Sequence, residues 1–333
     1  PAHRMSWVPP RVGDVARGDR TDEDRRSHLR PWAALPLAGP GVDRAAERRS
    51  EVGLLDHLMH DPATRVLAVR EGRFRVSDAG ALVLRPPEPD DATRLSVFLG
   101  EGEFPGSDGK AAYVGVVDPT APADDWAGVR SVATTLATAD ASLVATLTAL
   151  ANWHAAHGFC PRCGAATEPA HAGWLRRCVA DDSPHFPRTD PAVIMTVVDD
   201  DDRLLLARGR GFTTAGMSVL AGFVEPGESL AAAVAREVHE EVGVSVDQVE
   251  YLGDQPWPFP SSLMVGFRAH ATSTALSLQD DEIESARWFT RAELVADLEA
   301  GVLAISGRLS IARRLIEEWF GGPIAAPEAT LRR

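Results

Sequence analysis

Residues 222–244, with the sequence GFVEPGESLAAAVAREVHEEVGV, hold the carboxylates whose spacing is most suggestive of chemistry. After a loop with two glycines the stretch is rich in good helix formers and closes on a further glycine, which predicts a helix. Glu237, Glu240 and Glu241 then stand at i, i+3 and i+4, on one face of that helix. Three bare carboxylates repel one another, whereas Mg2+ or Mn2+ prefers such oxygen ligands and can activate water beside a diphosphate. The spacing therefore indicates hydrolysis with a divalent cation.

The residues around these glutamates fit the same chemistry. Gly222 and Gly227 let the loop turn tightly and approach a ligand. Arg236 lies four residues before Glu240 and can orient it. A lone acidic helix face is usually only solvated, but here glycines, an arginine and aliphatic residues recur at fixed spacing around the glutamates. The pattern resembles the Nudix box of the Nudix hydrolases, and that resemblance implies metal-dependent cleavage of nucleoside diphosphate derivatives on an α/β/α sandwich.

Gln255–Ser262, QPWPFPSS, is a second stretch of unusual composition. Its prolines predict a rigid loop over 254–262, in which Trp257 and Phe259 either stack on planar rings or fill the core. The stretch resembles the SQPWPFPxS signature of the NADH pyrophosphatases, the NudC-type branch of the Nudix hydrolases, although Asp254 replaces the first serine. That resemblance implies an N-terminal domain, a four-cysteine zinc ribbon and a C-terminal Nudix domain.

The resemblance also implies roles for individual positions. The group that it implies for catalysis and for Mg2+ or Mn2+ consists of the box glutamates, their arginine, a backbone carbonyl and a downstream carboxylate: Glu237, Glu240, Glu241, Arg236, Ala221 and Glu282. The family's usual second downstream glutamate is Ser285 here. The substrate contacts that it implies are Arg130, Phe186, Phe223, Gln255, Pro256, Trp257, Pro258, Phe259, Pro260, Ser261, Ser262, Met264 and Ala312. Core packing is the alternative for the aromatic residues, and an ordinary surface position is the alternative for the first arginine.

The three cysteines of the chain lie in one short stretch. Cys160 and Cys163 form a C-x2-C pair, and Cys178 begins a second pair in which Asp181 stands where the zinc-ribbon pattern has a cysteine. An odd, clustered set of cysteines favours a thiolate metal site or free thiols over a disulfide framework. Structural Zn2+ on these residues is therefore the prediction.

The fourth zinc ligand stays open in the sequence. Asp181 can bind zinc through oxygen, but carboxylates are less usual than thiolates in structural sites. His185 is an alternative ligand, and His171 is a more distant one. The other possibility is a ribbon held by the surrounding fold, with three buried thiols and no metal.

Length and pattern predict the elements that position these residues. The chain has 333 residues, with 44% apolar and 25% charged side chains, which favours several globular modules over one core. Apolar runs over 64–76, 81–86, 95–100 and 111–118 predict strands, and 142–158 predicts a helix that closes on Gly158 in a left-handed cap. The predicted class is α+β. Its modules are an N-terminal mixed-sheet domain (1–130), a connecting helix (131–157), a zinc-ribbon-like module (158–189), a Nudix sandwich (190–320) and a tail (321–333).

The function that the resemblance implies is hydrolysis of NAD(H) to NMN(H) and AMP, together with removal of NAD caps from RNA. The alternatives are a Nudix hydrolase of another nucleoside diphosphate derivative, such as ADP-ribose or a nucleotide sugar, and a non-catalytic module that binds nucleotide or RNA. A net charge of −14 argues against a protein that coats phosphate backbones. No apolar run is long enough for a membrane span. The cysteines favour a reducing compartment, so we predict a cytoplasmic protein, and the resemblance implies a homodimer.

Overall fold

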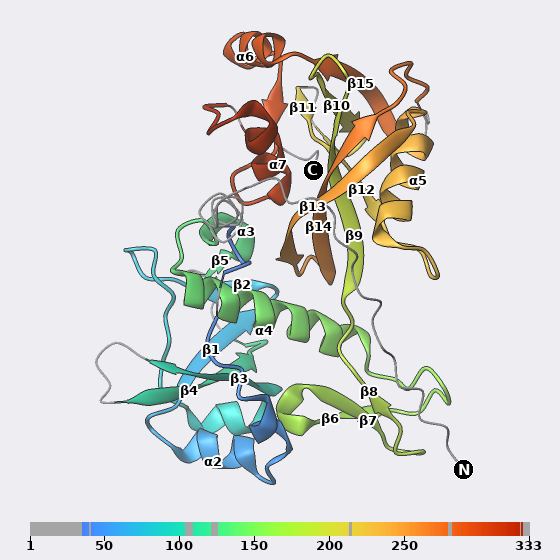
Figure 1. Cartoon of the computed structure of the whole chain (residues 1–333). Helices are drawn as coiled ribbons and strands as arrows, with labels where there is room; N and C mark the ends of the chain where they lie inside the picture. Colours follow the sequence, from blue (N-terminus) through green and yellow to red (C-terminus); the bar gives the residue numbers. More distant parts are fainter. Residues whose placement is uncertain are drawn as a thin grey trace, which may run out of the picture.

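The computed structural model describes residues 35–39, 41–103, 109–120, 126–212, 215–278, 282–326 and 328. Figure 1 shows an N-terminal sheet module at one end of the molecule and a C-terminal sandwich at the other, with a small three-stranded ribbon beside the first module. This arrangement confirms the predicted α+β class. The first 34 residues lie outside the described residues, as do residues 327 and 329–333 of the predicted tail. None of the helices in the described ranges is long and apolar enough to cross a membrane.

The N-terminal module is a five-stranded sheet in the order β3-β4-β1-β2-β5. Its strands are β1 (Arg65–Arg70), β2 (Arg73–Arg75), β3 (Ser96–Glu103), β4 (Lys110–Val117) and β5 (Trp126–Gly128). Helix α4 (Thr138–Ala156) packs on one face through Leu143, Val144 and Leu147, and α2 (Leu54–His60) packs on the other through Leu54 and Leu58. The predicted strand over 81–86 forms only isolated bridges to its neighbours. Two helices therefore bury both faces of this sheet.

Helix α4 ends differently from the sequence prediction. Its last residue is Ala156, and the capping residue His157 has a φ of −119°, so the expected left-handed cap at Gly158 is wrong. The reason is that the chain enters the ribbon at once. There the N–H of Thr167 donates to the Gly158 carbonyl at 3.0 Å, and the Thr167 hydroxyl donates to the His157 carbonyl at 2.9 Å.

The ribbon consists of β6 (Thr167–Ala170), β7 (Leu175–Cys178) and β8 (Pro184–His185). A buried hydrogen-bond network joins it to α4. Arg176 donates to the Thr167 hydroxyl at 2.7 Å and to Nδ1 of His154 at 2.9 Å, while Nε2 of His154 lies 2.8 Å from the Gly173 carbonyl. Since Arg176 can only donate, the imidazole accepts at Nδ1 and donates from Nε2, which is its neutral form. The ribbon is thereby fixed to the N-terminal module.

The C-terminal sandwich has a mixed sheet in the order β13-β14-β9-β10-β15, with β12 also paired to β9. Its strands are β9 (Asp190–Val198), β10 (Leu204–Gly209), β12 (Leu220–Phe223), β13 (Val246–Trp257), β14 (Ser262–Ala271) and β15 (Ile283–Phe289). The short strands β11 (Gly216–Met217) and β16 (Ala304–Ile305) pair apart from it. Helix α5 (Leu230–Val242) covers one face, and α6 (Arg291–Glu299) and α7 (Ile311–Phe320) cover the other, each over its own apolar core. The predicted α/β/α sandwich is thus confirmed.

Candidate active site and ribbon metal centre

The glutamate helix forms as predicted. The hydroxyl of Ser229 accepts from the Ala232 N–H at 3.2 Å and caps the start of α5, and Gly243, with a φ of 73°, ends it. The buried residues of α5 include Val234, Val238 and Val242, which pack against the sheet. This packing fixes the rotation of the helix and therefore the direction in which its glutamates point.

Arg236 connects the helix with the loop before it. Its guanidinium donates to both carboxylate oxygens of Glu228, at 3.1 and 2.6 Å, and to the Phe223 carbonyl at 2.9 Å. It also donates to Glu237 and to Glu240, both at 2.9 Å. The sequence predicted only the contact with Glu240. Arg236 therefore holds the loop and two of the three glutamates in one ion-paired cluster.

Glu241 is the most buried of the three glutamates, with 8% of its surface exposed. Its Oε2 atom is buried without a hydrogen-bond partner. Burial, followed by the charges of Glu237, Glu282 and Glu240, raises the pKa of Glu241 to about 8. Glu282, the predicted downstream carboxylate, is therefore close enough for its charge to act on Glu241. A buried, partnerless oxygen amid negative charge fits a divalent cation, since such a cation would supply the missing partner and favour the ionised form.

Four residues form a row across the sheet next to this cluster. Phe223 on β12 pairs with Ala192 on β9, Ala192 pairs with Met264 on β14, and Met264 pairs with Gln255 on β13. Phe223 is 59% exposed, so it does not fill the core. The predicted substrate residues Phe223 and Met264 thus flank one strand beside the box loop. Ala312, also predicted, is buried at the start of α7.

The stretch predicted as a rigid loop over 254–262 is mostly strand. Strand β13 continues to Trp257 and β14 begins at Ser262, so only residues 258–261 form the turn between them. The prolines fit because β13 is the edge strand of the sheet, where Pro256 interrupts no ladder on the open side. The loop is therefore the tip of a hairpin.

Gln255, a predicted substrate contact, has its whole amide group engaged by the protein's own backbone. It is completely buried, and its Nε2 donates to the carbonyls of Pro36 at 2.7 Å and Leu309 at 2.8 Å. Its Oε1 accepts from the Ile311 N–H at 2.8 Å. Both amide hydrogens and the carbonyl are therefore engaged, and Gln255 joins the hairpin to the N-terminal segment and to the start of α7.

The tip of the hairpin rests on the N-terminal module. The rings of Trp257 and Phe259 meet edge to face at 5.2 Å, and the Arg130 guanidinium lies 4.8 Å from the Phe259 ring and 5.6 Å from the Trp257 ring. Asn152 on α4 donates to the carbonyls of Pro258 at 3.0 Å and Pro260 at 3.1 Å. Arg130, a predicted substrate contact, is thus placed against the aromatic rings of the hairpin. Asn152 is a residue that the sequence interpretation missed, because its partners are backbone atoms more than a hundred positions away.

A cavity of about 250 Å³ lies between the hairpin and α4. Residues of the hairpin line one side, namely Pro256, Trp257, Pro258, Ser261 and Ser262, and Trp174 of the ribbon lines another. Phe186 is not among its lining residues; it follows β8 directly and is 68% exposed.

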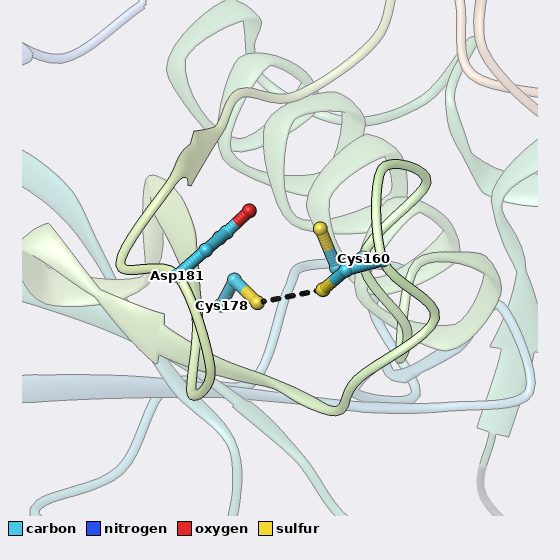
Figure 2. Close-up of side chains that lie close together, drawn as sticks. Cys160, Cys178 and Asp181 are labelled. Carbon is cyan, nitrogen blue, oxygen red and sulfur yellow. Dashed lines mark hydrogen bonds between the residues drawn. The ribbon is translucent and has the colours of Figure 1, made fainter.

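The cysteine stretch gathers into one group. Figure 2 shows Cys160, Cys178 and Asp181 converging from two loops of the ribbon. Together with Cys163 they offer ligand atoms that all lie within 4.8 Å of one another. Within the described parts of the chain this is the only such group of three or more possible ligands. Burial opposes ionisation of Cys160, but hydrogen bonds from the N–H groups of Arg162 and Cys163 lower the pKa of its thiol. These N–H donors favour the thiolate that zinc requires.

Comparison with known proteins finds matches to the two parts of the chain that carry these residues. A model of the NUDIX domain matches residues 188–306, and a model of the NADH pyrophosphatase zinc ribbon domain matches residues 155–186. The chain is 40% identical over 301 residues to the NAD-capped RNA hydrolase NudC of Mycobacterium tuberculosis (strain H37Rv), which covers 85% of this chain and 94% of that protein. The chain belongs to the NudC-type Nudix hydrolases.

Two further comparisons have narrower coverage. The NAD-capped RNA hydrolase NUDT12 of Homo sapiens is 42% identical over 192 residues, which is 54% of this chain and 42% of that protein. A solved Nudix hydrolase from Nitrosomonas europaea aligns with a TM-score of 0.40 at 20% identity, over 50% of this chain and 94% of that one. Membership of the NudC-type Nudix hydrolases makes the chain a hydrolase with a divalent metal at its box and a zinc-ribbon module.

Proposed function

We propose that this NudC-type enzyme hydrolyses NAD(H) to NMN(H) and AMP, and that it removes the NMN half from NAD-capped RNA. Relatives named NAD-capped RNA hydrolases and the zinc-ribbon match support the substrate class. The observation that carries the proposal is the buried, partnerless oxygen of Glu241 in a glutamate cluster that Arg236 ties to Phe223, an exposed aromatic residue where the box loop begins. A diphosphate held at the carboxylates would place an attached planar ring within reach of this aromatic.

We propose Mg2+ or Mn2+ as the divalent metal of the box. Glu237, Glu240, Glu241 and Glu282, with the Ala221 carbonyl, are the oxygen donors that would hold it, because these hard cations prefer carboxylate and carbonyl oxygens. When bound, such a cation neutralises charge on the diphosphate and makes a water molecule more acidic. Arg236 at present neutralises part of Glu237 and Glu240, so we expect it to keep the carboxylates in place before a ligand arrives.

Different residues of the chain would accept the proton, hold the substrate ring and shape the pocket. Hydrolysis adds water oxygen to one phosphorus and breaks the P–O bond to the bridging oxygen, so one proton must leave the attacking water. We assign this role to Glu241, because it is the most buried of the three box glutamates and one of its oxygens has no hydrogen-bond partner in the protein. Phe223 would hold a ring of the dinucleotide by stacking, which orients the diphosphate for attack. The hairpin from Gln255 to Ser262 is rigidly mounted, so we expect it to shape the pocket rather than to close over it.

A hydrolase of ADP-ribose or of a nucleotide sugar is the second candidate. One observation favours it. The amide of Gln255 in the hairpin makes all its hydrogen bonds to backbone groups, so it cannot also bind a second ring such as nicotinamide. A non-catalytic role is opposed by the complete set of box carboxylates. The resemblance alone supports two further proposals, a homodimer and a cytoplasmic location.

The deciding experiment measures products from NADH and from ADP-ribose in parallel. With Mg2+ or Mn2+ present, we expect equimolar AMP and NMNH from NADH, faster than AMP release from ADP-ribose, and no product after chelation. Faster turnover of ADP-ribose would support the second candidate, and no turnover of either substrate would contradict both. Size-exclusion chromatography with light scattering tests the dimer.

A further inference from the structure

The ribbon cluster differs from four thiolates at one position, Asp181. We propose that Ser183 positions the Asp181 carboxylate as the fourth ligand of the ribbon metal, and that His185 stays outside the ligand set. The inference rests on the zinc-ribbon module and is independent of which dinucleotide the box cleaves, so the two can fail separately.

The spacing of the donors fits a single small cation. Two ligands about 2.3 Å from zinc at the tetrahedral angle stand about 3.8 Å apart. The sulfurs of Cys163 and Cys178 are 3.5 Å apart, and all four donor atoms lie within 4.8 Å of one another. A modest contraction around the cation would therefore complete a tetrahedron, without any movement of the backbone strands.

Ser183 touches the carboxylate with two donors. Its N–H donates to Oδ1 of Asp181 at 3.0 Å, and its hydroxyl donates to the same oxygen at 2.5 Å. Ser183 is buried although Asp181 itself is exposed, so the exposed carboxylate is held from the protein side. With one oxygen fixed in this way the carboxylate loses its rotational freedom, and it is held near the cysteine sulfurs, with the ligand atoms within 4.8 Å of one another. A partner that orients a metal ligand in this manner raises the affinity for the metal.

The same hydroxyl accounts for the place of His185. Nε2 of His185 lies 3.3 Å from the Ser183 hydroxyl oxygen. A hydroxyl has one proton, which here goes to Asp181, so the serine oxygen can only accept from the imidazole. The Cys160 sulfur lies 3.7 Å from this oxygen as well. Ser183 thus stands between the histidine and the ligand group, and His185 supports the serine instead of the metal.

Substitutions at adjacent positions separate these roles. Asp181→Asn and Asp182→Asn are the same change on neighbouring carboxylates, and asparagine tolerates the left-handed backbone of Asp182, which has a φ of 57°. Zinc affinity is measured on reduced full-length protein by competition with a chromophoric chelator. We expect Asp181→Asn to weaken zinc binding at least about a hundredfold and Asp182→Asn to leave it unchanged. Loss of a group that orients a ligand costs about 10- to 100-fold in affinity, which is the effect expected for Ser183→Ala. Ser183→Thr keeps the hydroxyl and should restore binding.

Co2+ absorption gives a readout that a purely structural role would not change. The thiolate-to-cobalt charge-transfer band scales with the number of sulfur ligands, so Asp181→Cys should raise it by about one third over the wild-type protein. His185→Ala should leave the band and the zinc affinity within about threefold. Circular dichroism of each variant checks that it is folded.

Three results would overturn the assignment. The first is metal binding that survives Asp181→Asn but is lost in His185→Ala, which would make the histidine the ligand. The second is unchanged zinc affinity in Ser183→Ala. The third is less than a tenth of an equivalent of zinc in freshly purified, active wild-type protein that also fails to take up Co2+. NADH turnover measured on the same samples tests the proposed function independently.

Discussion

The carboxylate of Glu237 lies in the space that any side chain at position 222 would need. A Cβ atom on Gly222 would stand 1.9 Å from the carboxylate carbon of Glu237 and 2.1 and 2.2 Å from its two oxygens. The glycine of the box loop is therefore required by the glutamate of the box helix, and not by an unusual backbone angle.

Gly222→Ala should displace Glu237 without unfolding the sandwich. The new methyl group cannot share the space, and a half-buried carboxylate is easier to move than the strand β12. We expect affinity for Mn2+ and turnover to fall by at least about tenfold, since a metal ligand is misplaced. Calorimetric Mn2+ titration measures the first and product release the second. Gly322→Ala is the control, because a Cβ there meets no atom within 4 Å. Normal Mn2+ affinity in Gly222→Ala would contradict the assignment of Glu237 as a ligand.

Glu241→Gln should remove activity and leave a folded protein. Turnover should fall at least about a hundredfold if this carboxylate binds the metal or takes the proton from water. The exposed Glu299 on α6 provides the matched control, Glu299→Gln. Near-normal turnover in purified Glu241→Gln would rule out the role.

The stability of the metal-free protein gives a second test of Glu241, with a defined sign. Its folded-state pKa of about 8 is above the unfolded value, so its contribution to stability is complete at low pH and is lost as pH rises toward 8. Glutamine is neutral at every pH, so the contribution of this side chain to stability does not fall as pH rises. At pH 8 in chelator, Glu241→Gln should therefore be more stable than the wild type, by about 1–3 kcal/mol. Below about pH 4.5 the difference should vanish. Denaturant unfolding at both pH values measures it, and equal stability at pH 8 would show that Glu241 is not a strained anion.

Phe223→Ala should affect NADH more than ADP-ribose. Phe223 is exposed, so its removal leaves the core intact, and a stacked nicotinamide would lose its support. We expect kcat/KM for NADH to fall roughly ten- to a hundredfold, or about 1.4–2.7 kcal/mol. Phe159→Ala is the matched control, since that phenylalanine is also exposed but lies on the ribbon. Equal losses on both substrates would assign Phe223 to the adenine half.

His154 should make the joint between α4 and the ribbon sensitive to acid. Burial is the main reason that its pKa is lowered, and the charge of Arg176 adds to it. A lowered folded-state pKa means that the stability is present above the unfolded value, near pH 6.5, and is lost as pH falls below it. His154→Gln retains a donor and an acceptor but does not titrate. Between pH 8 and pH 5 the unfolding temperature of the wild type should fall further than that of His154→Gln, and parallel curves would contradict the argument.

Local signals in the sequence were sufficient for the box, because its helix has a cap, an apolar side and a terminating glycine within one short segment. They were not sufficient for Gln255. Its partners are the backbone carbonyls of Pro36 and Leu309 and the N–H of Ile311, groups that any residue presents and that only the folded chain brings together.

The prediction of a rigid loop at the hairpin prolines was wrong for a different reason. They argue against a central strand, but the position of β13 at the edge of the sheet, where proline is tolerated, is a property of the topology. The fourth ribbon ligand was open because Asp181 and His185 are both within reach of the cysteines along the chain. Only the orientation of Ser183 distinguishes them.

The strand β8 is only two residues long, and Phe186, a predicted substrate residue, follows it at once. A ring presented from so short a support would ordinarily sample many positions, and a ligand that stacked on it would have to overcome that loss of conformational entropy. Here the neighbouring strand β7 ends on Cys178, and Ser183 precedes β8 directly. A metal bound to the cluster would therefore restrain the position of Phe186, which lies five residues beyond Asp181, the last proposed ligand. We therefore expect the ribbon metal to affect substrate binding and not the hydrolytic step.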